Sequence, residues 1–368
     1  MKVQDVHQIM SAWAPPALAW DRDNVGLQVG DPRSRVKGIL VSLDPTEESV
    51  HEAERSGASL IVTHHPLLFR PLRSVTPASA AARCLELLVR TRIALYSAHT
   101  NLDFTREGTS FALASALGLR NVEFLDRPYR LDRKIVTFVP AESADRVARA
   151  MADAGAGIIG NYDHCSFRAE GTGTFRGNAA SSPALGRKGT LEKAREVRLE
   201  MVAPEWNVEH VVRAMQRSHP YEEVAFDVLS LENPSRNCGM GAVGTLLRPM
   251  PLSGFLALVR RTLGTKALRW CGSPRATVSR IALCAGAGGD LVESAIRAGA
   301  DVFLSADLKY HAFREAERTI ALIDAGHFET ELPVVGAIVS RLRTEFRRRG
   351  ERIPVRAARR AENPVRIL

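Results

Sequence analysis

Histidine and carboxylate residues gather in four loops of this chain, each directly after a run of strand-forming residues. In open α/β sheets, sites lie outside the carboxyl ends of the strands, so side chains distant in the sequence meet there. Imidazole nitrogens and carboxylate oxygens are common protein ligands of divalent metal ions. We therefore expect one shared metal site, built from the loops Thr63–Pro66, Ser97–Asp103, Ser305–His311 and Asp324–Glu331.

His64 and His65 are neighbours in the first of these loops. Adjacent side chains on a regular strand point to opposite faces, so both imidazoles can address one centre only if the chain is leaving the sheet. Pro66 favours the end of the strand at this point. Two metal ions lying side by side would explain the pair, with one imidazole for each ion. The alternative is a pair of histidines at a surface turn.

His327 and Glu331 are four residues apart, which on a helix places both side chains on one face. Pro333 is tolerated only in the first turn of a helix, so we expect the helix to begin near Thr330, with His327 in the approaching loop. A carboxylate suits a position between two cations, because each oxygen can bind one ion. The alternative for Glu331 is an acid that complements the helix dipole.

Asp103 supplies a second carboxylate, and we expect it to be a metal ligand oriented by Asn101 or His99. For His99, the role of an ordinary hydrogen-bonded loop histidine is an equal alternative.

In the third loop, Asp307, Lys309 and His311 could bind an acidic ligand or support the metal ions, although Lys309 and His311 also suit exposed helix positions. The glycine-rich segment Cys284–Asp290 lacks the Lys-Ser/Thr of a Walker loop. It could cradle one phosphate, or it could be a tight turn between a strand and a helix.

Short apolar runs alternate with helical stretches in both the first and the last part of the chain. Strands of this length alternating with helices of 10 to 15 residues predict a layered α/β fold with a largely parallel sheet. The two parts are similar to each other in this rhythm. The predicted strands are 38–43, 59–63 and 93–97 in the first part, and 280–284, 301–304 and 319–323 in the last.

The middle of the chain, about 131–231, follows a β-α-β-β-α-β order, which is typical of a ferredoxin-like α+β domain. Its predicted elements include separate strands around Cys165–Arg168 and Gly173–Arg176, followed by a loop at Gly177–Gly189. The fold class is therefore α/β, with two similar α/β halves and an inserted ferredoxin-like domain. We place the first half at 1–126, the insertion at 127–234 and the second half at 235–368.

The charge is concentrated at the end of the chain: residues 341–368 hold ten arginines and three glutamates, or +7 of the formal +9. A nearly neutral body disfavours a dedicated nucleic-acid binder, although the basic tail leaves nucleic acid as a weakly supported partner. This tail could be a terminal strand or a flexible arm. The five cysteines are widely spaced without a CxxC pair, and no long apolar run occurs, so we expect a cytoplasmic protein with reduced thiols and no membrane association.

The same loops carry a resemblance to the Nif-three-like family, often described as GTP cyclohydrolase I type 2 homologues. The matching segments span both outer parts of the chain in the family's order. The middle part is similar to the insertion of the longer members, which resembles PII and CutA domains. The outer matches are Asp23–Gly30, Thr63–Pro66, Ser97–Asp103, Ser305–Asp307 and Gly326–Glu331; the middle ones are Ile159–Tyr162, Cys165–Phe167, Gly171–Phe175 and His219–Glu223.

The resemblance implies two divalent metal ions in each subunit and a ring-shaped homohexamer. His64 and Asp103 would hold one ion, His65 and His327 the other, and Glu331 would be shared. These donors suit Zn, Fe, Mn, Co or Ni without choosing among them. The implied activity is metal-dependent hydrolysis of a small molecule, a nucleotide or a related phosphorylated heterocycle. The alternative is a protein that binds or delivers metal ions or a metallocofactor without turnover of its own.

Overall fold

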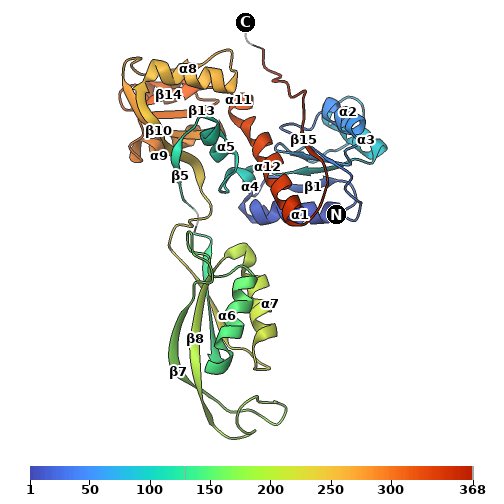
Figure 1. The fold of residues 1–368 in the computed structure, drawn as a ribbon, viewed down its shortest axis with the longest axis vertical. Coiled ribbons are helices and arrows are strands. Elements are labelled where there is room, and N and C mark those ends of the chain that lie inside the picture. Colours follow the sequence, from blue (N-terminus) through green and yellow to red (C-terminus); the bar gives the residue numbers. More distant parts are fainter. Residues whose placement is uncertain (129, 367–368) are drawn as a thin grey trace. The chain divides into compact units, whose positions relative to one another are not determined.

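The computed structural model describes residues 1–128 and 130–366 (Figure 1). Contacts between residues divide the chain into two units. Unit 1 joins residues 1–126 to residues 238–368, and unit 2 comprises residues 127–237. Two segments far apart in the sequence therefore build one folded body, and the intervening segment builds another.

The first sheet of unit 1 has three parallel central strands, and every residue of all three is buried. Its order is β1-β4-β3-β2-β15, with β1 antiparallel to β4 and β15 parallel to β2. The strands are β1 (Gly26–Val29), β2 (Ile39–Ser42), β3 (Leu60–Thr63), β4 (Ala94–Ser97) and β15 (Val355–Ala357).

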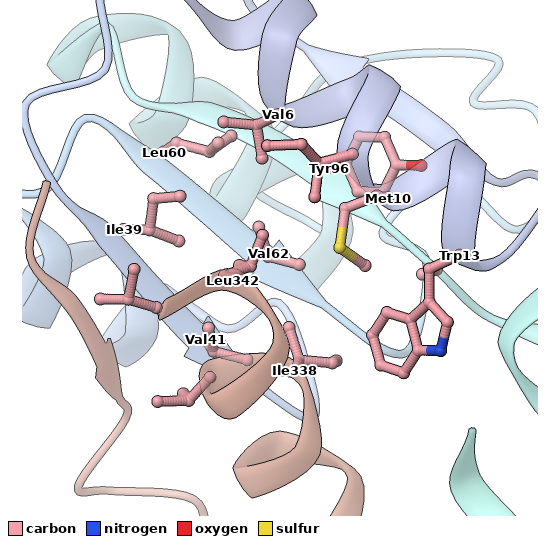
Figure 2. Packing of buried hydrophobic residues seen from close by; sticks show 14 of the residues in the cluster. Val6, Met10, Trp13, Ile39, Val41, Leu60, Val62, Tyr96, Ile338 and Leu342 are labelled. Atoms are coloured by element: carbon pink, nitrogen blue, oxygen red, sulfur yellow. The ribbon is translucent and has the colours of Figure 1, made fainter. Parts of the chain in front are cut away.

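Helices cover both faces of this sheet, because alternate residues of its strands point to opposite sides. Ile39 and Val41 of β2 pack in one apolar cluster with α1 (Val3–Trp13) and α12 (Pro333–Arg348), as Figure 2 shows. Leu40, between them, packs in a second cluster with α2 (Glu47–Ser56) and α3 (Ala80–Thr91). This layering fixes the carboxyl ends of β2, β3 and β4 at one edge of unit 1.

The second sheet of unit 1 repeats this plan. Its order is β11-β14-β13-β12-β10-β5, in which β12, β13 and β14 are parallel and β11 is antiparallel to β14. Its strands are β5 (Arg120–Asp126), β10 (Met240–Pro251), β11 (Arg269–Trp270), β12 (Thr277–Ala287), β13 (Val302–Ala306) and β14 (Ala321–Asp324). Helices α5 (Thr109–Ala116), α8 (Leu252–Leu263), α9 (Val292–Arg297) and α10 (Tyr310–Ala316) contribute to its two apolar clusters.

The two halves exchange segments. Strand β5 belongs to the first segment of the chain but pairs with β10 in the second sheet. Conversely, α12 and β15 lie near the end of the chain but pack on the first sheet. The arginine-rich tail thus contains a terminal strand, one of the two alternatives considered above.

Unit 2 is a four-stranded antiparallel sheet of order β7-β8-β6-β9 with two helices. This is the ferredoxin-like arrangement expected from the sequence, although the two strands predicted around Cys165 and Gly173 are a single strand, β7. The apolar core lies between the helices and one face of the sheet. The elements are β6 (Asp132–Pro140), α6 (Ala144–Asp153), β7 (Phe167–Phe175), β8 (Glu192–Pro204), α7 (Val208–Ser218) and β9 (Phe226–Ser230).

Short helical turns connect these elements. They are η1 (Pro16–Leu18), α4 (Thr100–Asp103), η2 (Ala141–Ser143), η3 (Glu205–Asn207), η4 (Gly289–Leu291) and α11 (His327–Glu331). None of the five cysteines forms a disulfide. No helix in residues 1–128 or 130–366 has both the length and the apolar character needed to cross a bilayer.

Candidate metal centre

The carboxyl ends of strands from both sheets of unit 1 present histidines and carboxylates to one place. His64 and His65 follow β3, and His327 follows β14. Asp103 ends the short helix α4, which follows β4, and Glu331 ends α11. The structure brings all five predicted residues together, because ring-to-carboxylate and ring-to-ring distances link them into one cluster.

The two adjacent histidines face the same centre because the chain turns directly after β3. The Thr63 hydroxyl donates to the carbonyl oxygen of His65 at 2.7 Å, which bends the backbone around His64. The centroids of the His64 and His65 rings lie 5.0 Å apart. The His64 side chain is fully buried, so the surface-turn alternative does not describe it.

Helix α11 begins at His327, three residues earlier than the sequence predicted. Gly326, with φ +90°, lets the chain turn sharply into the helix directly after β14. Pro333 has no N–H to donate, so it cannot extend α11 and instead starts α12. Consequently His327 and Glu331 do lie one helical turn apart on the same face, with His327 Nε2 3.1 Å from Glu331 Oε1.

Glu331 is the hub of the cluster. Its other oxygen, Oε2, lies 3.0 Å from His65 Nε2, and its Oε1 lies 3.8 Å from His64 Nε2. Asp103 Oδ1 approaches His64 Nε2 from the other side, at 3.6 Å. A carboxylate with only 6% of its side chain exposed is therefore surrounded by three imidazoles.

Each histidine is oriented through its other ring nitrogen. His64 Nδ1 lies 2.8 Å from the carbonyl oxygen of Ala98, and His65 Nδ1 lies 2.7 Å from Asp44 Oδ1. His327 Nδ1 lies 2.7 Å from Asp307 Oδ2. Because these oxygens accept hydrogen bonds, Nδ1 carries the proton and the Nε2 lone pair faces the cluster, as in metal-binding histidines.

His99 belongs to the same cluster, although it was not among the ligands expected from the sequence. Its Nδ1 lies 2.9 Å from Asp23 Oδ1, and its ring centroid lies 5.2 Å from that of His64. A ligand atom of His99 lies within 4.8 Å of ligand atoms of both His64 and His65. The residues His65, His327 and Glu331 form a second group that meets the same criterion, so the cluster contains two groups that could hold a metal ion.

The buried polar atoms of the cluster test whether a cation fits there. Among the described residues, His64 Nε2 and Glu331 Oε2 are buried without a hydrogen-bond partner. Glu331 Oε2 is close to His65 Nε2, but an imidazole lone pair and a carboxylate oxygen repel each other unless a proton or a cation lies between them. Unsatisfied buried atoms of this kind are costly. The donor set and its orientation thus fit divalent cations.

Without a cation, protons take its place. Burial raises the pKa of Glu331, but the neighbouring rings of His327, His64 and His65 outweigh burial and hold that pKa far below its usual range. Burial lowers the pKa of His65, whereas Asp44 and Glu331 together raise it to about 10. The hydrogen bond to Glu331 raises the pKa of His327 to about 9. The carboxylates favour positive charge in this cluster.

Other predictions for the loops were partly wrong. Asp103 accepts a hydrogen bond from Thr109, rather than from Asn101 or His99. Asn101 instead donates to the carbonyl oxygen of Ala14 and accepts from the His99 N–H. The nearby residues Lys309 and His311 are exposed and belong to neither group of metal-binding atoms.

The glycine-rich segment at the end of β12 contributes close packing at the cluster. Gly286 has φ +68°, and a Cβ atom at this position would overlap Glu331 Oε1. Its N–H donates to Thr330 at 3.0 Å, and its carbonyl accepts from Ser305 at 2.9 Å. The segment therefore lets Glu331 approach the backbone.

Two supporting carboxylates escaped the sequence-based prediction. Asp44 lies two residues after β2, so the rule that found the other loops would also have found it. Asp23 lies before β1 and is distant in the sequence from the end of every parallel strand. Only the motif Asp23–Gly30 included it.

Comparisons with known proteins find a matching family model, similar sequences and a similar solved structure. A family model described as Duf34/NIF3 (NGG1p interacting factor 3) matches residues 1–364. A Mycobacterium tuberculosis protein named GTP cyclohydrolase 1 type 2 homolog is 39% identical over 97% of this chain and 94% of its own length. Its namesake from Halalkalibacterium halodurans is 37% identical over 88% of each chain. The crystal structure of a Bacillus cereus protein related to NIF3 is 35% identical, with a TM-score of 0.88 over 100% of this chain and 99% of that one.

Proposed function

Because this chain belongs to the Duf34/NIF3 family, and because its histidines and carboxylates converge in unit 1, we propose that it binds two divalent metal ions and uses them to hydrolyse a small molecule. The observation that carries the proposal is the buried His64 Nε2, which has no hydrogen-bond partner among the described residues and faces two carboxylates.

The resemblance to the family implies a division of the ligands into two sets, which we adopt in this proposal. His64 and Asp103 would hold the first ion. His65 and His327 would hold the second, since both approach the same carboxylate at 3.0 to 3.1 Å. Glu331 would be shared between the two ions, because its carboxylate is near all three imidazoles. Zn, Fe, Mn, Co and Ni all suit this donor set.

Two divalent cations, when bound, polarise substrate oxygen atoms and lower the pKa of water, which is the chemistry that hydrolysis requires. The chain's own residues would prepare the site for it. Asp44 and Asp307 hold the rings of His65 and His327 in place. Asp103 and Glu331 offset the positive charge. Asp23 fixes the His99 ring beside His64 and His65.

For the substrate we propose a nucleotide or a related phosphorylated heterocycle. The support is the name of the relatives, GTP cyclohydrolase 1 type 2 homolog, which corresponds to hydrolytic opening of a purine ring.

The test is to incubate metal-free protein and its Zn, Mn, Fe and Co forms with GTP and a panel of nucleotides. Purine absorbance and formate release by proton NMR would be followed. We expect turnover with at least one metal form, background rates for metal-free protein and for Glu331→Gln, and unchanged turnover for the control His51→Ala, an exposed histidine on α2. Fully loaded protein that converts no nucleotide would contradict the hydrolase, and rapid metal transfer to a chelator would then favour metal delivery.

A further inference from the structure

Unit 2 contains a cavity of about 720 Å³ that the proposed metal centre does not use. Phe138 of β6, Glu196 and Arg198 of β8, and Gly171 of β7 line it. These residues share one face of the sheet, because Phe138 pairs with Arg198 and Gly171 pairs with Glu196. The alternate residues of β6 and β8 pack against the helices, so the cavity lies on the opposite face.

Glycines keep the floor of this cavity open. Glycine inside a strand weakens it and often marks a place where a ligand approaches closely. A Cβ atom at Gly171 would meet no atom within 4 Å, so it would project into open space. A Cβ atom at Gly173 would overlap the carboxylate of Glu196, which lies across that glycine.

The motif His219–Glu223, which takes no part in the metal centre, forms one wall of the cavity. A chain of hydrogen bonds holds it in place. His219 Nε2 donates to the carbonyl oxygen of Phe138 at 3.1 Å, and His219 Nδ1 accepts from the Tyr221 N–H at 3.1 Å. The Tyr221 hydroxyl donates to Glu196 Oε1 at 2.8 Å. Burial and the neighbouring Glu196 raise the pKa of Tyr221, so the hydroxyl stays a donor. Both Tyr221 and Glu196 are thereby held in fixed positions.

The loop between β7 and β8 forms a second wall, and a hydrogen bond joins it to the motif. The Ser182 N–H donates to Glu222 Oε1 at 2.6 Å. Gly189 N–H donates to the carbonyl oxygen of Gly177 at 2.7 Å, which closes the base of the loop. The cavity therefore has a sheet as its floor and two linked loops as its walls.

The lining combines aromatic rings with an excess of negative charge. Phe175 and Tyr221 lie with ring centroids 6.3 Å apart. Four glutamates and two arginines line the cavity: Glu170, Glu196, Glu222, Glu223, Arg176 and Arg198. Arg198 is neutralised by Glu200, which lies outside the lining, at 2.7 Å. Among the described residues, Glu196 forms no ion pair, and its hydrogen-bond partner is the neutral Tyr221.

We propose that this cavity binds a small organic cation, an amine, amidine or guanidine with a flat or apolar body. The positive group would lie against the Glu196 carboxylate, and the body would pack on Phe175 and Tyr221. Aromatic rings attract cations through their faces, and a carboxylate adds a charge-assisted hydrogen bond. An anion such as a free nucleotide would meet the excess of glutamates and bind poorly. This site is independent of the metal centre.

Calorimetric titration of the full-length protein tests the proposal with matched probes. Benzamidine is a flat cation, benzamide its neutral counterpart and benzoate its anionic one; agmatine and tyramine extend the series of cations. We expect benzamidine to bind at least about tenfold more tightly than benzamide, as a charged hydrogen bond predicts. Benzoate should bind least.

Single substitutions test whether the preference for cations arises in this cavity. Glu196→Gln should remove the preference for benzamidine over benzamide, and Phe175→Leu should weaken both. Glu205→Gln, an equal charge change at an exposed residue outside the cavity, should leave the preference intact. Circular-dichroism melting checks that each variant folds. The proposal is overturned if none of the three cations binds better than benzamide and benzoate, or if the preference survives in Glu196→Gln.

Discussion

His64 Nε2 and Asp103 Oδ1 lie 3.6 Å apart in unit 1, too far for a hydrogen bond and close enough for one cation to touch both. His64 comes from the turn after β3, and Asp103 comes from the turn after β4. Since β3 and β4 are parallel neighbours, their carboxyl ends place the two side chains at one edge of the sheet. The relationship is a direct consequence of the topology.

Replacement of Asp307, the carboxylate partner of His327 Nδ1, should weaken metal binding without removing a metal ligand. Asp307→Asn keeps a residue type that tolerates the observed φ of +55°. It replaces the charged partner of His327 Nδ1, and such supporting groups typically contribute about 10- to 100-fold in affinity. Competition with a chromophoric zinc chelator measures the change. Asp290→Asn, an exposed aspartate, is the control, and equal affinities for the two variants would contradict the assigned role.

A methyl group at Gly286 should disturb Glu331. Gly286→Ala places a Cβ atom on Glu331 Oε1, whereas Gly299→Ala, with a similar φ of +65°, meets no atom within 4 Å. Both variants carry the left-handed backbone penalty of about 1 to 2 kcal/mol. Urea unfolding should therefore show destabilisation in both, and elemental analysis should show metal loss only in Gly286→Ala. Normal metal content in Gly286→Ala would argue against close packing at Glu331.

The stability of the metal-free protein should fall as the pH rises above neutrality. The pKa of His65 is about 10 and that of His327 about 9 in the folded chain, against an ordinary value of 6.5. Groups with raised pKa values stabilise the folded state fully below pH 6.5, and this contribution disappears as the pH passes through their folded pKa values. Metal-bound imidazoles carry no such proton, so loaded protein should lose less.

Thermal melting between pH 6 and pH 10, with and without EDTA treatment, measures this difference. In the metal-free state, a variant with both His65 and His327 replaced by glutamine should show a flatter pH profile. Identical profiles for the variant and the parent protein would contradict the proposed coupling between the histidines and Glu331.

Removal of unit 2 should leave unit 1 folded. Asp126 and Met240, which flank the insertion, are paired residues of the neighbouring strands β5 and β10. A short Gly-Ser linker in place of residues 127–237 can therefore close the gap as a hairpin. We expect a single cooperative melting transition and unchanged metal content. An aggregated product, or one without metal, would mean that unit 1 depends on the insertion.

Much of the fold follows from local patterns. The runs that became β2, β3 and β4 were predicted to within one residue at each end, because a short apolar run between two helices is typical of a buried strand. The exchange of segments between the halves could not be predicted. Periodicity identifies β5 and β15 as strands at best, and their partners β10 and β2 are set by packing in three dimensions.

The metal-binding cluster was likewise predictable only in part. The rule that sites lie at the carboxyl ends of parallel strands located His64, His65 and His327. The pairing of His99 with Asp23 was beyond it, because loop residues distant in sequence have no fixed spacing. Pro333 indicates a helix start near Thr330, whereas the backbone turn at Gly326 already begins α11 at His327.

Metal content tests the central claim most directly. Protein purified without a metal-affinity tag, together with His65→Ala, Glu331→Ala and the control His51→Ala, would be analysed for bound metal by mass spectrometry. We predict two equivalents in the parent and in the control, about one in His65→Ala, and none in Glu331→Ala, because the shared carboxylate serves both ions. Equal metal content in Glu331→Ala and the parent protein would contradict the dinuclear centre.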